Sequence, residues 1–500
     1  MKIIILICVS SIVLANNVAV ENISMTGLDA ANDYTMIEFD IAWDNSWRTS
    51  SGPSNWDASW VFVKWQINGG AWSHCTLNTT NGNHTAPSGT TIDAASDGTG
   101  VFIYRSVDGS GSNDWVNAQL RWEYGTDGVV DDATVTVKVF AIEMVYIPQG
   151  SFYVGSGGNE DGHFYEYPTT TNEYQITSEE AITVGTTSGN LYYPLRTYGG
   201  DQSGPIPADY PKGYSAFYIQ KYGISQGQYA DFLNMLTTTQ QGNRTATMTS
   251  SKYVMTNTST VSYRNGLYTS DGSAIVCDYD DDGTGDESND GENIACNYLS
   301  WADGTAYADW AGLRPFTSLE FEKACRGTEG PVANEYAWGN ANIAESAYTL
   351  SNSGVNTEGI ATNYGTGSIG NASYETTDGS IDGPLRCGVF AAHASNSGRI
   401  NAGASFYGAM ELSGNLWERH ITVGNTTGRS FTGVHGNGAL TTDGDADVTN
   451  WPSSNATGTG WRGGAWSNGS TYLSVSDRGQ STRTDAGRQD DCGFRASRTQ

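Results

Sequence analysis

Hydrophobic and polar residues alternate, or run apolar for the length of a strand, in six segments near the start of the chain. Gly, Asn, Asp and Ser residues separate these segments, so each is expected to form a β-strand that ends at a turn. The segments are residues 18–24, 34–41, 60–65, 100–104, 118–122 and 133–139. Several short strands with such turns predict an antiparallel β-sandwich over residues 16–142.

The last of these strands continues through residues 140–142 into the apolar run 144–147 without a Pro or Gly-Ser spacer. Independent domain motion needs a flexible linker, so we expect the two parts of the chain to be rigidly joined near residue 143. The first part is also rich in tryptophan, which serves either as core or as a sugar-stacking platform, and core is the commoner use in a small β-domain. These residues are Trp43, Trp47, Trp56, Trp60 and Trp65.

The apolar spacing changes to a helical period in three stretches of the second part, residues 143–500. Each stretch follows a residue that can cap a helix, and Thr317 with Glu320 has the spacing of a capping box. The predicted helices cover residues 224–233, residues 301–310 and a segment from 317 to near 327, with Ser225, Ser300 and Thr317 as N-caps. Helices among short strands predict an α+β fold for this part.

Residues 1–15 have the pattern of a signal peptide, because Lys2 precedes an apolar run that ends at the small residue Ala15. We therefore expect a secreted protein, extracellular or at the cell surface. No later stretch of about 20 apolar residues predicts a membrane span. A formal net charge of −29 argues against nucleic-acid binding and suits divalent cations.

Eight short motifs follow one another in a fixed order between residues 143 and 498. They lie at residues 144–152, 217–222, 301–310, 314–316 and 336–340, in the run GAMELSGNLWE at 408–418, and in WRGGAW at 461–466 with GFR at 493–495. In this order the chain resembles the sulfatase-modifying-factor family, whose founding members are the formylglycine-generating enzymes. The resemblance implies an elaborated C-type-lectin-like fold with long ordered loops.

The resemblance also implies two calcium sites made of hard oxygen ligands. The first has carboxylates from Glu411 and Glu418 and main-chain oxygens from Gly414 and Leu416. The second would fall on Asn363, Asp378 and the carbonyls of Tyr364 and Ser380.

The two copper-binding cysteines of formylglycine-generating enzymes have no counterpart at the matching positions. Leu473 stands at the first, and Asp477 or Arg478 stands at the second, depending on the direction of counting. None of these can bind Cu(I) as a thiolate. The sequence has no Ser-His-Asp order, P-loop or dinucleotide fingerprint that offers another chemistry.

An acidic insertion at residues 276–292 predicts a calcium loop that is independent of the family. Its acidic residues occupy positions 1, 3, 5 and 9 of an EF-hand-like pattern, with Gly283 at position 6. The candidate ligands are Asp278, Asp280, Asp282, Thr284 and Asp286. Position 12 is Asn289, which leaves Asp290 or Glu292 to substitute for the usual Glu, and the alternative is a solvated acidic loop.

Six of the seven cysteines remain after the predicted signal peptide, because Cys8 lies within it. An even number in an exported protein permits disulfides, and Cys277 with Cys296 would close the base of the acidic insertion. The alternative is that the cysteines are buried free thiols.

Two functional interpretations remain. The first is a secreted, non-catalytic, calcium-stabilised protein that binds a glycan or a surface protein, or that assembles with itself into a filament, matrix or surface layer. The second is a divergent enzyme, an oxidoreductase or a peptide-modifying enzyme, with a relocated active site.

Overall fold

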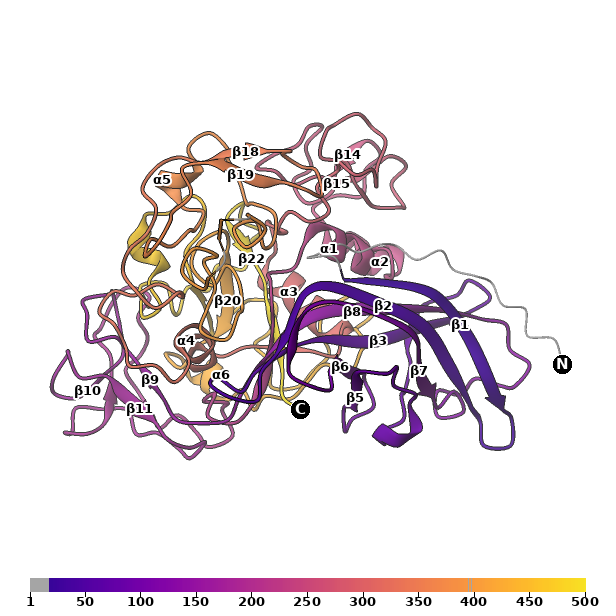
Figure 1. The fold of residues 1–500 in the computed structure, drawn as a ribbon, viewed down its shortest axis with the longest axis horizontal. Coiled ribbons are helices and arrows are strands. Elements are labelled where there is room, and N and C mark those ends of the chain that lie inside the picture. Colours follow the sequence, from indigo (N-terminus) through magenta and orange to yellow (C-terminus); the bar gives the residue numbers. More distant parts are fainter. Residues whose placement is uncertain (1–17, 394, 397) are drawn as a thin grey trace.

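The computed structural model describes residues 18–393, 395–396 and 398–500. The expected signal peptide, residues 1–15, lies outside the described residues. Figure 1 shows long strands from the first part of the chain on one side and a body of loops, short strands and helices on the other. No helix within the described ranges is long and apolar enough to cross a membrane.

The first sheet joins β1 (Ala19–Asp29), β2 (Tyr34–Arg48) and β7 (Gly109–Trp122) in the antiparallel order β1-β2-β7. In β2 every second side chain is buried, among them Ile37 and Phe39. This period of two is the one that the sequence pattern predicted, and it leaves one face of the sheet for the core.

A second, eight-stranded sheet runs through both parts of the chain. Its order is β17 (Arg314–Pro315), β23 (Ala496–Arg498), β13 (Phe217–Gln220), β8 (Val135–Ile147), β3 (Asp57–Ile67), β6 (Val101–Arg105) and β5 (Thr90–Ala94), with β4 (Ser73–His74) paired to β3. Strand β8 pairs with β3 on one side and with β13 on the other. The expected boundary near residue 143 therefore falls inside a continuous strand.

Strand β3 separates two hydrophobic cores. Val61 and Val63 face a core shared with β2 and β7, whereas Trp60 and Phe62 face a core that includes Phe232 and Trp310 from helices of the second part. A strand that is buried on both faces needs a continuous apolar run, as β3 has. All five tryptophans named above belong to these cores or pack against a core.

The predicted helices form where their caps indicated. They are α1 (Gln226–Leu233), α3 (Trp301–Trp310) and α4 (Ser318–Arg326), with complete capping boxes at Ser225, Ser300 and Thr317. A further helix, α2 (Thr238–Arg244), was not predicted, although Thr237 and Gln240 give it the same cap. Its only buried residues are Gln241 and Arg244, so it has no apolar stripe to reveal it.

The remaining elements of the described chain are short and are connected by long loops. They are β9 (Phe152–Val154), β10 (Tyr165–Glu166), β11 (Tyr174–Ile176), β12 (Leu191–Tyr192), β14 (Lys252–Tyr253), β15 (Leu267–Thr269), β16 (Val276–Cys277), β18 (Thr349–Ser351), β19 (Gly359–Thr362), β20 (Trp417–Ile421), β21 (Thr459–Arg462), β22 (Cys492–Gly493), α5 (Glu375–Asp378), α6 (Thr426–Arg429), and the 3₁₀ turns η1 (Asn81–Asn83) and η2 (Ser470–Leu473). The fold is therefore β-rich, with several antiparallel sheets.

Buried arginines hold these loops together. The guanidinium of Arg495 donates to the carbonyls of Gln220 and Lys221 at 2.7 and 2.9 Å and to that of Met410 at 2.6 Å. Other fully buried arginines include Arg314, Arg326, Arg419, Arg462 and Arg478. Each guanidinium carries five N–H donors, so one side chain can satisfy carbonyls from several loops.

The packing of α3 predicts opposite effects for two helical Gly→Ala substitutions. A Cβ at Gly304 would lie 2.0 Å from the ring of Phe494, whereas a Cβ at the exposed Gly242 in α2 meets nothing within 4 Å. Gly304→Ala should therefore lower the free energy of unfolding by about 1–3 kcal/mol through overpacking. The control Gly242→Ala should raise it by about 0.5–1 kcal/mol through helix propensity. Urea unfolding measures both, and stabilisation by Gly304→Ala would contradict the packing described.

Candidate metal centres

The Gly-Asn-Leu-Trp-Glu segment places two acidic side chains in the interior. Glu418 lies on β20, which pairs with β21 on one side and with β22 on the other. Its Oε1 accepts a hydrogen bond from Nε of Arg495 at 2.6 Å and forms an ion pair with Nη2 of the same side chain, also at 2.6 Å. Glu411 Oε1 accepts a hydrogen bond from the amide of Gly388 at 2.8 Å. The site thus contains two buried carboxylates and one buried guanidinium.

Glu411, Leu416, Glu418 and Arg495 line a cavity of about 10 Å³, which has room for about one water molecule or ion. Burial raises the pKa of Glu411 to about 7, although the charge of Arg495 opposes this shift. The buried Glu418 Oε2 has no hydrogen-bond partner among the described residues. Two carboxylates thus share one guanidinium, and one of their oxygens has no partner. This arrangement fits a hard cation such as calcium.

Three of the four residues predicted for this site come together at the cavity. Gly414 is not among the lining residues. Its amide donates to the carbonyl of Gly463, and its own carbonyl accepts from the amide of Leu416. Arg495 was missed as a member of the site. The only sequence signal for it was its place in the GFR motif.

The side chains of the second predicted set have separate contacts in the described structure. The side-chain amide of Asn363 donates to the carbonyl of Ala347 at 2.6 Å, and the ring of Tyr364 lies against His393. The carboxylate of Asp378 accepts from the amide of Asp382 at 3.0 Å, and burial raises its pKa to about 6. Ser380 is exposed. In the described structure Asn363 and Asp378 share no hydrogen bond, and this calcium site stays a prediction.

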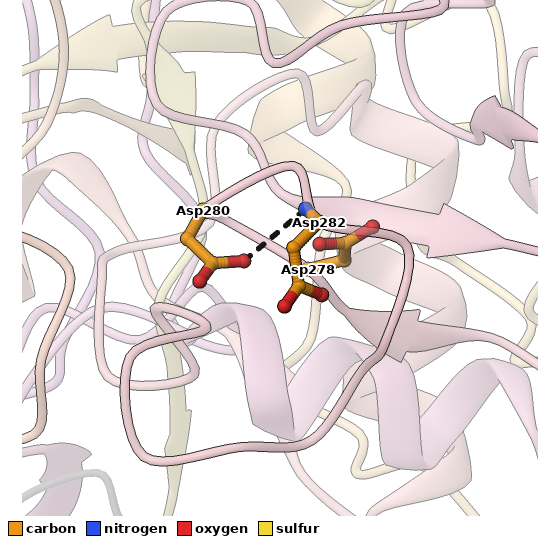
Figure 2. Close-up of side chains that lie close together, drawn as sticks. All are labelled: Asp278, Asp280 and Asp282. Atoms are coloured by element: carbon orange, nitrogen blue, oxygen red, sulfur yellow. Dashed lines mark hydrogen bonds between the residues drawn. The ribbon is translucent and has the colours of Figure 1, made fainter.

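The acidic insertion brings three carboxylates together. One oxygen each from Asp278, Asp280 and Asp282 lies within 4.8 Å of the others (Figure 2). The amide of Thr284 donates to Asp282 Oδ1 at 2.7 Å, which leaves Thr284 on the turn beside the group. Asp286 is not part of the group, because its carboxylate accepts from the amide of Cys277 at 3.2 Å.

The six described cysteines are buried free thiols, including Cys277 and Cys296. The predicted disulfide between these two is therefore not formed, although both side chains belong to the same hydrophobic core. Burial raises the pKa of all six thiols, which keeps them protonated at neutral pH. None has the character of a reactive or copper-binding thiolate.

The positions that correspond to the copper cysteines are filled by packed side chains. Leu473 is fully buried in a cluster with Tyr336, Trp338 and Tyr374. The second position falls on Asp477 or Arg478. Asp477 is buried and accepts a hydrogen bond from the amide of Gly479 at 3.1 Å. Arg478 lies over the ring of Phe164, with its guanidinium carbon 3.9 Å from the ring centroid, and donates to the carbonyl of Gly162 at 2.9 Å. Because these side chains are packed, the structure gives these positions a role in holding loops together.

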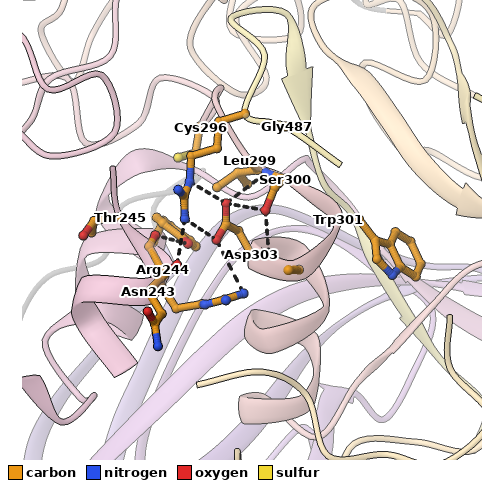
Figure 3. Close-up of polar contacts among 12 residues, drawn as sticks. Asn243, Arg244, Thr245, Cys296, Leu299, Ser300, Trp301, Asp303 and Gly487 are labelled. Atoms are coloured by element: carbon orange, nitrogen blue, oxygen red, sulfur yellow. Dashed lines mark hydrogen bonds and ion pairs between the residues drawn. The ribbon is translucent and has the colours of Figure 1, made fainter. Parts of the chain in front are cut away.

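A buried ion network at the start of α3 was also missed from the sequence. Asp303 accepts from the amide and hydroxyl of Ser300 at 3.0 and 2.7 Å, and from Nε and Nη2 of Arg488, both at 2.8 Å. Arg244, at the end of α2, lies 3.6 Å from the same carboxylate (Figure 3). The network connects α2, α3 and the loop before β22, and every charge in it has a partner, so we assign it a structural role.

These features define a β-rich protein with two acidic oxygen sites and without a thiolate pair in its described part. Residues 132–500 match the family model of the sulfatase-modifying factor enzyme 1-like domain, and the chain belongs to this family. The match begins just before β8 and therefore includes the whole strand that the two parts share. None of the curated proteins that were compared matches the chain.

Asp477 predicts a measurable pH dependence of stability. Burial raises its pKa from the ordinary 3.8 to about 7. Its contribution to stability is therefore complete below about pH 4 and is lost as the pH rises to about 7, with a slope of at most about 1.4 kcal/mol per pH unit. Asp477→Asn should flatten the free energy of unfolding over this range, and the exposed control Asp132→Asn should not. Equal slopes for Asp477→Asn and the wild type would count against this assignment.

Proposed function

We propose that this protein is a non-catalytic member of its family that acts outside the cell as a calcium-stabilised scaffold. The observation that carries the proposal is what stands at the two copper-cysteine positions: Leu473, packed in an apolar cluster, at the first, and Asp477 or Arg478, both buried, at the second. Oxidation of a peptide cysteine by the family's known route needs two thiolates that bind copper. The chain supplies buried side chains without sulfur at these places.

Export is supported by the apolar run of residues 3–14 and the small residue that follows it. We assign the second part the elaborated C-type-lectin-like fold of the family, in keeping with its short strands and long loops. In such a scaffold the loops carry binding, and we propose a glycan, a surface protein or further copies of the chain as the partner. A net charge of −29 then makes divalent cations useful where surfaces approach one another.

Calcium is the proposed cofactor of the cavity between Glu411 and Glu418. The two carboxylates would hold the ion, with Arg495 balancing part of their charge. When bound, the ion would offset the charge of the unpartnered Glu418 Oε2 and fix the loop of Glu411 to β20. This role is structural and requires no change in the oxidation state of the metal.

The proposal predicts that a peptide with the sulfatase motif is not converted to its formylglycine form. Mass spectrometry of the peptide after incubation with the protein and copper measures the conversion, and an active formylglycine-generating enzyme serves as the positive control. Leu473→Cys alone should also be inactive, because Cu(I) capture at this site needs two sulfur ligands. Turnover by the wild type, or stoichiometric copper or iron in the purified protein, would favour the enzyme interpretation instead.

Calcium removal should destabilise the protein. At a calcium concentration one hundred times the Kd, a site present only in the folded state contributes about 2.7 kcal/mol. Glu411→Gln should show a smaller change of melting temperature between calcium and EGTA than the wild type, whereas the exposed control Glu345→Gln should match the wild type. If Glu411→Gln and the wild type respond identically to EGTA, calcium does not bind in this cavity.

A further inference from the structure

The base of the acidic insertion contains a carboxylate that is buried without any hydrogen bond. Asp278 follows β16 directly and is 0% exposed. The amides of Asp282 and Gly283 face its carboxylate, yet neither of its two oxygens has a hydrogen-bond partner in the described structure. Burying an ionised carboxylate without a partner destabilises the folded protein unless a cation or a proton neutralises the charge.

The exposed carboxylates of the insertion converge on this buried group. An oxygen of Asp280 and one of Asp282 lie within 4.8 Å of an oxygen of Asp278 (Figure 2). Gly283 has φ of 85°, so the chain can turn sharply directly after Asp282. Three like charges at this spacing repel one another, and an ion among them would convert the repulsion into attraction.

A second buried carboxylate, that of Asp290, lies later in the same insertion. Asp290 is also 0% exposed, and only its Oδ2 has a partner, the amide of Glu287 at 2.6 Å. Its Oδ1 is buried without a partner. Burial is the main cause that raises the pKa of Asp290 to about 7, and the charges of Asp280, Glu292 and Asp278 act in the same direction. Asp290 does not belong to the group of three converging carboxylates.

We propose that this insertion is a calcium site whose ligands are the carboxylates of Asp278, Asp280 and Asp282. Asp286, which the sequence pattern also named, is left out of this site because its carboxylate accepts a hydrogen bond from the amide of Cys277. Hard oxygen ligands on a flexible loop suit calcium, whereas magnesium demands a stricter octahedron, and no nitrogen or sulfur ligand belongs to the group. The inference is independent of the proposed function, since it uses none of the residues around Glu411.

The contacts of the insertion indicate what the ion would order. The hydroxyl of Tyr279 lies 3.3 Å from the hydroxyl of Ser353, and the amide of Asn356 donates to the carbonyl of Ser288 at 3.1 Å. Gly354 packs so closely that a Cβ there would lie 2.1 Å from the ring of Tyr279. The turn between β18 and β19 therefore packs against the acidic insertion, and Figure 1 shows this hairpin beside β14 and β15.

Calcium counting on the full-length protein tests the proposal. Protein stripped with EGTA is dialysed against calcium chloride, and bound calcium is measured for the wild type, for Asp280→Asn/Asp282→Asn, and for the control Asp132→Asn/Asp443→Asn. The control makes the same change of charge at two exposed positions. The loop variant should bind about one calcium fewer per chain than the wild type, and the control should bind as many. Equal binding by all three proteins overturns the proposal.

Hydrogen exchange gives a local readout that does not depend on the other site. Calcium should slow exchange in residues 276–292 and in residues 352–358 of the wild type and of Glu411→Gln, but not in the loop variant. A further variant, Asp278→Asn, removes the buried charge that has no hydrogen-bond partner. It should melt in EGTA at or above the wild-type temperature while losing the calcium-dependent protection of the loop. Unchanged exchange of residues 276–292 in the wild type on addition of calcium overturns the proposal, whatever the result at Glu411.

Discussion

The loop-rich part of this molecule depends on buried guanidinium groups. Loop carbonyls have no helix or strand to satisfy them, and a buried carbonyl without a partner costs about 1–3 kcal/mol. Arg419 alone donates to the carbonyls of Leu299, Asp485 and Gly487 at 3.1, 2.6 and 2.8 Å. Because each arginine bonds to loops that are distant in sequence, the loops can keep one arrangement with very little regular structure. The same use of arginine explains why Arg478 fits where a copper ligand would stand.

Local signals were enough to predict the main helices and the strands of the first part. Capping depends on residues three apart, so Ser300 and Thr317 could be recognised as helix starts, and the alternation in β2 lies within one strand. The order of the large sheet could not be predicted in this way. β13 and β23 contribute only a few residues each, too few for a period to be recognised, and their partners lie far away in sequence.

For the candidate sites, too, local contacts could be predicted from the sequence and long-range contacts could not. The convergence of Asp278, Asp280 and Asp282 follows from their alternate spacing on one turn, and the sequence showed it. The exclusion of Asp286 depends on a hydrogen bond to the main chain of Cys277, and the partner of Glu418 is Arg495, which lies 77 positions away. Neither contact leaves a pattern in the sequence, because both arise only when separate segments are packed against one another.

Strand β23 has a consequence for how the chain folds. Among the described strands it is the last to be synthesised, yet it lies inside the large sheet, between β17 and β13. Until residues 496–498 arrive, β13 and β17 keep open edges that can pair with the wrong strand or with another molecule. Strands β3 and β8 can pair before β23 is synthesised, so the first part of the sheet can form while synthesis of the chain continues. A chain cut a few residues short would therefore leave β17 without its partner and β13 with an open edge, rather than merely lacking a tail.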